Sequence, residues 1–238
     1  MFLKKQEEFN NAMQKYHQNK FYQHVYTFVS VVNIGLEVIL LYILFTLNIS
    51  WFWMLPVFLI AYFSTDFLNG FVHLYMDNND NYNSFAGVFI ARFHLHHKTP
   101  TYKNKNVFVI YFNESGSKFW LVPYLIVVLF LSTLDINHIF LTVLILVGIL
   151  SSFAEVSHYL CHNSKSKIVL FLQKIGLLLS MNHHERHHME DNNRYAFLNG
   201  MSDFILDKIA KIFYGGYKDN LDKHYEMYRE EDTSNRSS

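Results

Sequence analysis

Residues 26–75 read YTFVSVVNIGLEVILLYILFTLNISWFWMLPVFLIAYFSTDFLNGFVHLY and contain neither Lys nor Arg. The connector Asn48-Ile49-Ser50 divides this stretch into two apolar runs, each long enough to cross a bilayer as a helix. A second stretch without Lys or Arg, 119–164, divides in the same way at 135–137. The sequence therefore predicts an all-α integral membrane protein with four transmembrane helices in two hairpins, at about 26–48, 51–75, 118–134 and 136–160.

The charged residues support this arrangement. The 20 Lys and Arg residues fall in three blocks, Lys4–Lys20, Arg92–Lys118 and Lys165–Arg236. By the positive-inside rule all three blocks are cytoplasmic, so both termini face the cytoplasm, in a bacterial inner membrane or the endoplasmic reticulum. The 20 acidic residues balance the basic ones, and no excess charge indicates nucleic acid. A soluble all-α protein with buried helices is the alternative, which four such apolar runs disfavour.

The remaining segments are more polar. The chain is predicted to divide into a cytoplasmic lead-in, a membrane domain and a charged tail: 1–25, 26–216 and 217–238. Residues 77–118 read as a polar loop, and 165–181 as an interfacial or re-entrant helix. Residues 202–213 resemble that helix, with Ser202 as a possible N-cap, and the tail is expected to be solvated or disordered. The one cysteine, Cys161, excludes an internal disulfide.

Histidine is the unusual residue type, with 14 copies in the chain. On the predicted topology ten of them lie near the cytoplasmic face, at span ends or in cytoplasmic segments: His73, His94, His96, His97, His158, His162, His183, His184, His187 and His188. His94 is the weakest ligand candidate of the ten, because His96 and His97 beside it are better placed. The sequence predicts that the other nine converge on metal.

Helical spacing strengthens this prediction. Asp66, Gly70, His73 and Asp77 follow one stripe of a helix, which makes Asp77 a candidate ligand. Three pairs are separated by four residues, as at helical metal sites: His158 with His162, His183 with His187, and His184 with His188. Asp66 and Glu155 are expected to orient imidazoles through their outward-facing N–H groups.

This number of nitrogen donors exceeds what one ion needs, so two adjacent ions are expected. Imidazole suits Zn, Fe, Cu and Ni, and the sequence offers no set of thiolates. We favour two irons that activate O₂ as co-substrate, because a histidine-rich pair of ions at a membrane surface suits redox chemistry better than zinc chemistry.

Four blocks of residues in order carry a family resemblance. They are Asp66-x-x-x-Gly70-x-x-His73-x-x-x-Asp77; Phe93-x-x-His96-His97-x-x-Pro100, with Asn113 beyond it; His158-x-x-x-His162; and His183-His184-x-x-His187-His188, followed by Tyr195 and Gly200. Through them the chain resembles the membrane lipid desaturase family of plasmanylethanolamine desaturase. That family includes the chloroplast phosphatidylglycerol trans-desaturase and bacterial plasmalogen-forming relatives.

The resemblance implies a two-iron site and O₂-dependent removal of two hydrogens from an acyl or alkyl chain of a membrane phospholipid. It also implies a separate electron donor of the cytochrome b5 or ferredoxin type. The chain departs from the family pattern in three places. Leu74 stands where the family has Trp, Tyr159-Leu160-Cys161 lacks the family Trp, and Asp191-Asn192 replaces a Pro-His pair. Asn192 is then either a weaker ligand or a lost metal position.

Two other functions remain open. A di-iron lipid or fatty acid hydroxylase uses similar histidine motifs, including His-x-x-His-His, which His184, His187 and His188 satisfy. A metal-ion transporter is less favoured, since transporters place ligands near the bilayer midplane. Only Asn33 and Glu37 lie that deep, and we expect them to hydrogen-bond to a neighbouring helix rather than line a substrate cleft.

Overall fold

The computed structural model describes residues 2–98, 106–218, 222, 224 and 227–229. All regular secondary structure within those residues is helical, as predicted. The elements in chain order are α1 (Phe2–Gln18), α2 (Lys20–Thr46), α3 (Trp51–Asp77), α4 (Gly87–Lys98), α5 (Val107–Glu114), the 3₁₀ turn η1 (Ser115–Ser117), α6 (Leu121–Leu131), α7 (His138–Asn163), α8 (Lys167–Lys174), α9 (Met181–Met189) and α10 (Asp203–Phe213).

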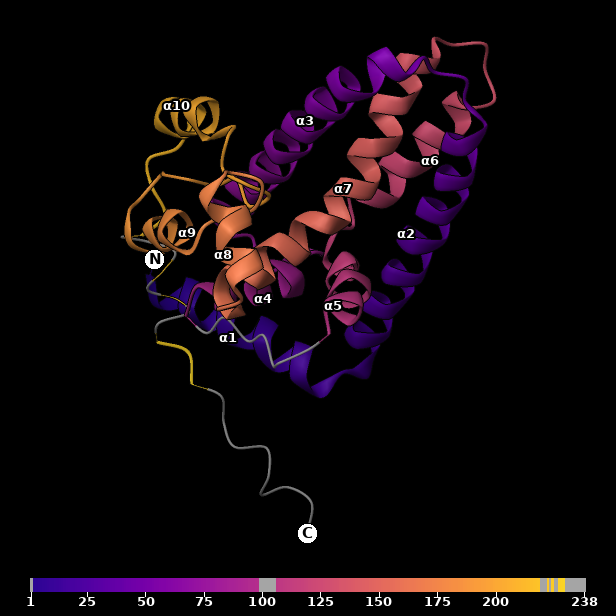
Figure 1. The fold of residues 1–238 in the computed structure, drawn as a ribbon. Helices are drawn as coiled ribbons and strands as arrows, with labels where there is room; N and C mark the ends of the chain where they lie inside the picture. The colour runs from indigo at the N-terminus through magenta and orange to yellow at the C-terminus, as the bar shows by residue number, and fades with distance from the viewer. Residues whose placement is uncertain (1, 99–105, 219–221, 223, 225–226, 230–238) are drawn as a thin grey trace.

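Three helices are long and apolar enough to cross a membrane, namely α2, α3 and α7. Helices α3 and α7 pack along each other, and α2 packs against α6 and α7. Short helices α1, α4, α8 and α9 gather at one end of the long helices, whereas the α2–α3 and α6–α7 connections lie at the opposite end (Figure 1). The chain therefore has the architecture of a membrane protein with a polar assembly at one end.

The third predicted span, 118–134, differs from the structure. Helix α6 has only 11 residues, or about 16 Å of length, which is too short to cross a bilayer. Residues Val107–Ser117 and Leu121–Leu131 form a pair bent by 94°, so the described chain has three candidate spans, or up to four if this pair counts as one.

Helix α2 holds the bend in place. Asn33 Nδ2 donates to the carbonyls of Ser115 and Lys118, at 2.9 and 3.2 Å. A Cβ on Gly116 would lie 2.5 Å from the Tyr26 carbonyl oxygen, so only glycine allows this approach. Glu37 accepts from the Tyr111 hydroxyl of α5 at 2.7 Å. The expectation that these residues hydrogen-bond to a neighbouring helix is confirmed for Glu37, whereas Asn33 bonds to the backbone of the 3₁₀ turn between α5 and α6.

The prediction of a polar loop over 77–118 is wrong, because α4 and α5 lie within it. Val88, Ile90 and Ala91 of α4 pack against Phe9 and Met13 of α1. Asparagines at 78, 79, 81 and 83 give the segment a polar appearance, but residues 85–91 after them are apolar, and α4 becomes buried against α1 and the aromatic residues around it. The N-terminal helix thus supports the helix that bears His96 and His97.

The C-terminal segments also differ in detail. Helices α8 and α10 fall inside the two predicted amphipathic segments. Ser202 precedes α10 but makes no side-chain cap, since its hydroxyl donates to Asp66. Tyr217, where we expected a solvated tail to begin, is 1% exposed. Its hydroxyl donates to the His187 carbonyl at 3.1 Å, so this residue belongs to the folded core.

Candidate metal centre

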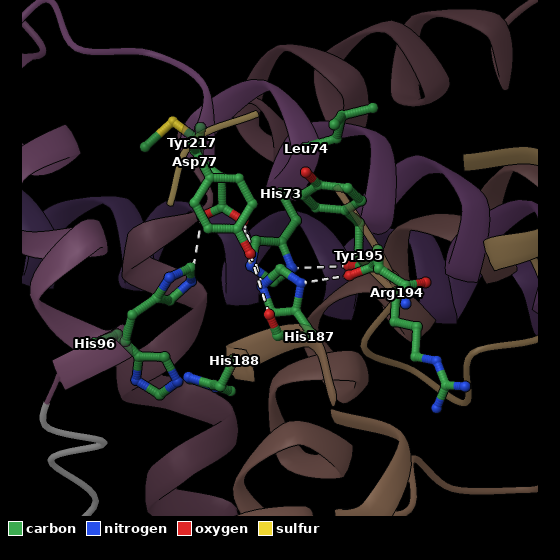
Figure 2. A network of polar contacts seen from close by, with 12 residues as sticks. His73, Leu74, Asp77, His96, His187, His188, Arg194, Tyr195 and Tyr217 are labelled. Carbon is green, nitrogen blue, oxygen red and sulfur yellow. Dashed lines mark hydrogen bonds and ion pairs between the residues drawn. The ribbon is translucent and has the colours of Figure 1, made fainter. Parts of the chain in front are cut away.

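Eight side chains converge in two neighbouring groups at one end of the long helices. We call His96, His158, His162 and His184 the four-histidine group, and His73, Asp77, His97 and His187 the aspartate-containing group. Within each group, one ligand atom per residue lies within 4.8 Å of the others. His73, Asp77 and His187 turn toward one another, with His96 and His188 on the neighbouring side (Figure 2). All eight were predicted as ligands.

Four helices supply the groups in a simple pattern. Helix α3 contributes only to the aspartate-containing group, and α7 only to the four-histidine group. Helices α4 and α9 each contribute one histidine to each group. Helix α4 supplies His96 and His97, and α9 supplies His184 and His187. Successive helical residues point about 100° apart, so neighbours such as His96 and His97 can face different groups. The two groups therefore share helices α4 and α9, so a shift of either helix would move ligands of both groups.

In the aspartate-containing group the Asp77 carboxylate is central. Its Oδ2 lies 3.4 Å from His73 Nε2 and 3.3 Å from His187 Nε2, and its Oδ1 lies 3.3 Å from His97 Nε2. Neither Asp77 oxygen, nor His187 Nε2, makes a hydrogen bond to any described residue. Buried polar atoms are rarely left so, and these atoms fit a cation placed between them.

The four-histidine group converges through Nε2 atoms. His158 Nε2 lies 2.8 Å from His184 Nε2, and 3.2 Å from both His96 Nε2 and His162 Nε2. His188 Nε2 lies 2.9 Å from His184 Nε2, which places His188 beside this group as a fifth donor. So many imidazole nitrogens on one centre exceed what mutual hydrogen bonding satisfies, whereas a metal ion would accept several lone pairs at once.

Backbone carbonyls orient two of the ligands. His73 Nδ1 lies 2.7 Å from the Tyr195 oxygen, and His187 Nδ1 lies 2.8 Å from the Asn193 oxygen. A carbonyl only accepts, so Nδ1 of each ring donates and Nε2 keeps its lone pair toward the group. In the four-histidine group, Glu155 lies on the Nδ1 side of His158, with its Oε2 3.9 Å from that nitrogen, which is beyond hydrogen-bond distance.

Burial also keeps most of these imidazoles ready to bind metal. Desolvation and the neighbouring imidazoles hold the pKa of His96 and of His184 well below the usual range, and they lower the pKa of His188. Burial alone would lower the pKa of His97 too, but the Asp77 carboxylate beside it raises that pKa overall. The imidazoles of His96, His184 and His188 are thus neutral near neutral pH, so each ring has one nitrogen with a lone pair, as a metal ligand needs.

The structure does not bring His183 into either group. Its Nε2 lies 2.5 Å from Asp203 Oδ2, so the ring ties α9 to α10. His94 is likewise elsewhere, with its Nε2 2.8 Å from the Met76 oxygen. Asn192 donates to the Tyr214 carbonyl and accepts from the Tyr195 hydroxyl, so its amide braces the loop after α9.

Asp66 does not meet an imidazole, contrary to the expected contact. Its two oxygens accept from the hydroxyl of Ser202 and from four backbone N–H groups, those of Leu198, Asn199, Gly200 and Ser202. This fixes the 195–202 loop on α3, and Gly70 allows the close approach because a Cβ there would lie 2.9 Å from the Ala196 Cα. Asp66 therefore acts on the metal groups only through the loop that bears the Tyr195 carbonyl.

Several contributors to the site were not predicted. The carbonyls of Asn193 and Tyr195 are backbone groups, so their residue types carry no signal for this role. Lys118, assigned to a cytoplasmic basic block, is buried beside Glu155 at 2.9 Å. Its position at the edge of a basic-free stretch was the only available hint.

Comparisons with known proteins agree with this geometry. A lipid desaturase domain matches residues 62–214, which include all eight residues of the two groups. "Fatty acid desaturase 4-like 2, chloroplastic" from Arabidopsis thaliana is 29% identical over 158 residues, covering 62% of this chain and 53% of the relative. "Fatty acid desaturase 4, chloroplastic" from the same plant is 28% identical over 159 residues, covering 64% and 47%. The chain spans about half the length of these relatives. No solved structure matches it.

Proposed function

Because this chain belongs to the lipid desaturase domain family, whose members are oxidoreductases acting on membrane lipids, we propose that it is a di-iron desaturase. It introduces a double bond into the acyl or alkyl (ether) chain of a membrane phospholipid, in the manner of plasmanylethanolamine desaturase. The observation that supports this most strongly is the pair of adjacent ligand groups, each with four converging donor atoms.

The donor set suits iron. Imidazole nitrogens and one carboxylate are ligands that iron accepts, and none of the eight residues of the groups is a thiolate. One iron would be held by the four-histidine group with His188 beside it, and the other by the aspartate-containing group. Two bound irons would supply the O₂-dependent oxidation of an unactivated C–H bond.

The protein's own residues prepare the site in two ways. The carbonyls behind His73 and His187 hold each ring with its Nε2 inward. His73, Asp77, His184 and His187 are at most 5% exposed, so bulk water has little access to these four ligands. Helices α2, α3 and α7 would lie in the lipid bilayer, with the two ligand groups near one end of them.

The overall reaction defines the partners. The lipid chain loses two hydrogens, and O₂ is reduced to two waters. The substrate provides two of the four electrons and two of the four protons; a separate carrier of the cytochrome b5 or ferredoxin type provides two electrons, and water two protons. On the positive-inside argument, both termini and the metal groups face the cytoplasm, where such carriers are found.

Lipid mass spectrometry tests the proposal. Cells would express the full chain with a cytochrome b5 or ferredoxin, either as wild type, as His184→Ala, or as His24→Ala, which changes an exposed histidine outside both groups. We expect one phospholipid class to lose two hydrogens with the wild type and the control but not with His184→Ala. Acid lability of the product would identify a vinyl ether.

Two outcomes would contradict the proposal. Gain of one oxygen in place of loss of two hydrogens would identify a hydroxylase, which the His-x-x-His-His motif also permits. Unchanged product with His184→Ala would show that the four-histidine group is not part of the reaction centre.

A further inference from the structure

Lys118 is a buried cation between the membrane helices and the metal groups. It follows η1 at the bend before α6, and its side chain is 4% exposed. A buried ammonium is costly unless charge and hydrogen-bond partners surround it. Lys118 therefore needs specific partners, and these partners indicate its role.

Three partners from three different elements surround its ammonium. Lys118 Nζ donates to Asn69 Oδ1 of α3 at 2.5 Å and lies 2.9 Å from Glu155 Oε1 of α7. It also lies 4.6 Å from the ring centre of Phe197, in the loop after α9. The Asn69 amide is itself fixed, because its Nδ2 donates to the Thr65 carbonyl and the Ser151 hydroxyl. Lys118 thus joins helices α3 and α7 to the loop after α9.

Two of those partners contact the metal groups directly. Glu155 Oε2 lies 3.9 Å from His158 Nδ1, on the side of the ring opposite to the Nε2 that faces His184. The centre of the Phe197 ring lies 5.5 Å from the ring centres of both His158 and His73, which belong to different groups. Only Glu155 therefore stands between Lys118 and the four-histidine group, and only Phe197 stands between Lys118 and a histidine of each group.

We propose that Lys118 is a positioning residue for the four-histidine group: it fixes Glu155 behind His158 so that His158 presents Nε2 to the metal. This rests on the proposed function, in which the group holds a metal ion. Lys118 balances the buried charge of Glu155, so the carboxylate can stay beside His158 Nδ1 and favour the ring tautomer with its proton there. Without Lys118, the Glu155 carboxylate loses its counter-ion and its fixed position.

Cobalt(II) binding to the purified full chain in detergent tests this, because visible absorption of cobalt reports ligand number and geometry. The variants are Lys118→Met, Lys118→Arg, and Lys5→Met, a control that removes a lysine paired with Glu8 and Asp80 at the surface. We expect two cobalt ions per chain for the wild type and Lys5→Met. For Lys118→Met we expect weakened binding at one site and an altered spectrum.

Lys118→Arg keeps the charge and should restore much of the spectrum, although its planar head differs in shape. With iron, Lys118→Met should lower kcat about 10- to 100-fold, as loss of an outer contact to a metal ligand does, with little change in KM. A role in folding alone would lower thermal stability but leave the cobalt spectrum and stoichiometry as in the wild type, and this result would overturn the proposal.

A variant without an unpaired charge covers the case in which Lys118→Met fails to fold. Lys118→Met/Glu155→Gln removes both charges together, which avoids a buried uncompensated ion. The proposal expects this double variant to fold and still show an altered four-histidine site; a wild-type spectrum would overturn it. A wild type that binds no cobalt would overturn both this proposal and the proposed function. Two bound cobalt ions with no effect of Lys118 would overturn this one alone.

Discussion

The two ligand groups share helices α4 and α9 but differ in where their carboxylate lies. In the aspartate-containing group, Asp77 faces inward among three imidazoles. In the four-histidine group, the nearest carboxylate is Glu155, which lies behind His158 and is paired with Lys118. One group therefore offers a metal ion a negative ligand, and the other offers only neutral ones.

The two metal positions are therefore chemically different. A direct carboxylate ligand partly neutralises the charge of its ion, whereas a carboxylate behind a histidine acts by orienting the ring. The distinction comes from α3 and α7, because α4 and α9 contribute one histidine to each group. Variants on α3 and α7 can therefore separate the groups.

Removal of one ligand from each group should have the largest effect. We expect Asp77→Ala and His162→Ala each to lose one of two metal ions and more than about 100-fold of the activity, beyond the loss from an outer contact. Metal analysis and lipid turnover would measure this, with His24→Ala as the control. Two metal ions and normal turnover in both variants would show that neither residue is a ligand.

Asp66→Asn should have the next largest effect and should act on one group first. Each Asp66 oxygen accepts at least two hydrogen bonds, so an NH₂ group in place of one oxygen leaves at least two donors unsatisfied; at about 1–3 kcal/mol each, we expect a loss of about 2–6 kcal/mol. The loop that Asp66 fixes bears the Tyr195 carbonyl behind His73. The aspartate-containing group should therefore lose its metal first.

Thermal unfolding and metal analysis would measure both effects. Asp135→Asn, at an exposed position in the α6–α7 connection, is the matched control. Equal loss of metal from both groups would mean that the loop does not discriminate between them.

His183→Ala should have a smaller effect and tests whether α9 provides a further ligand. Because His183 bonds to Asp203, its loss should cost about 1.5–3 kcal/mol of stability, as for a hydrogen bond to a charged group. Both metal ions should remain, in contrast to His184→Ala at the adjacent position. Loss of a metal ion from purified His183→Ala would restore His183 to the ligand set.

The smallest expected effect is a difference in pKa between the adjacent residues His96 and His97 in the metal-free protein. Burial lowers the pKa of His96, while Asp77 raises that of His97 despite burial. Protonation of His97 thus stabilises the fold below the pKa of an unfolded imidazole, and this contribution is lost as pH rises through the higher folded pKa. For His96 the sign is opposite, and stability is lost as pH falls below the unfolded pKa.

NMR of labelled histidine rings would follow both residues, with single variants providing the assignment. Asp77→Asn should lower the pKa of His97, because the strongest effect opposing burial is removed and only the weaker one of Asp222 remains, and should leave the pKa of His96 nearly unchanged. A His97 that titrates like His96 in the wild type would contradict the charge difference between the groups.

Much of the fold and the site could be predicted because the signals are local. An uninterrupted apolar run without charge predicts a membrane helix, and histidines four residues apart share a helix face. These rules found α2, α3 and α7 and all eight residues of the two groups. They failed for α4, whose apolar run is short and becomes buried only when helices distant in sequence, such as α1, pack against it.

The helical membrane class and the set of candidate ligands follow from local sequence, because periodicity and hydropathy are properties of consecutive residues. The assignment of His96 and His97 to different groups, the pairing of His183 with Asp203 and the burial of Lys118 against Glu155 depend on tertiary packing. Helical spacing sets which face a side chain occupies, whereas the packing of helices distant in sequence sets what that face meets.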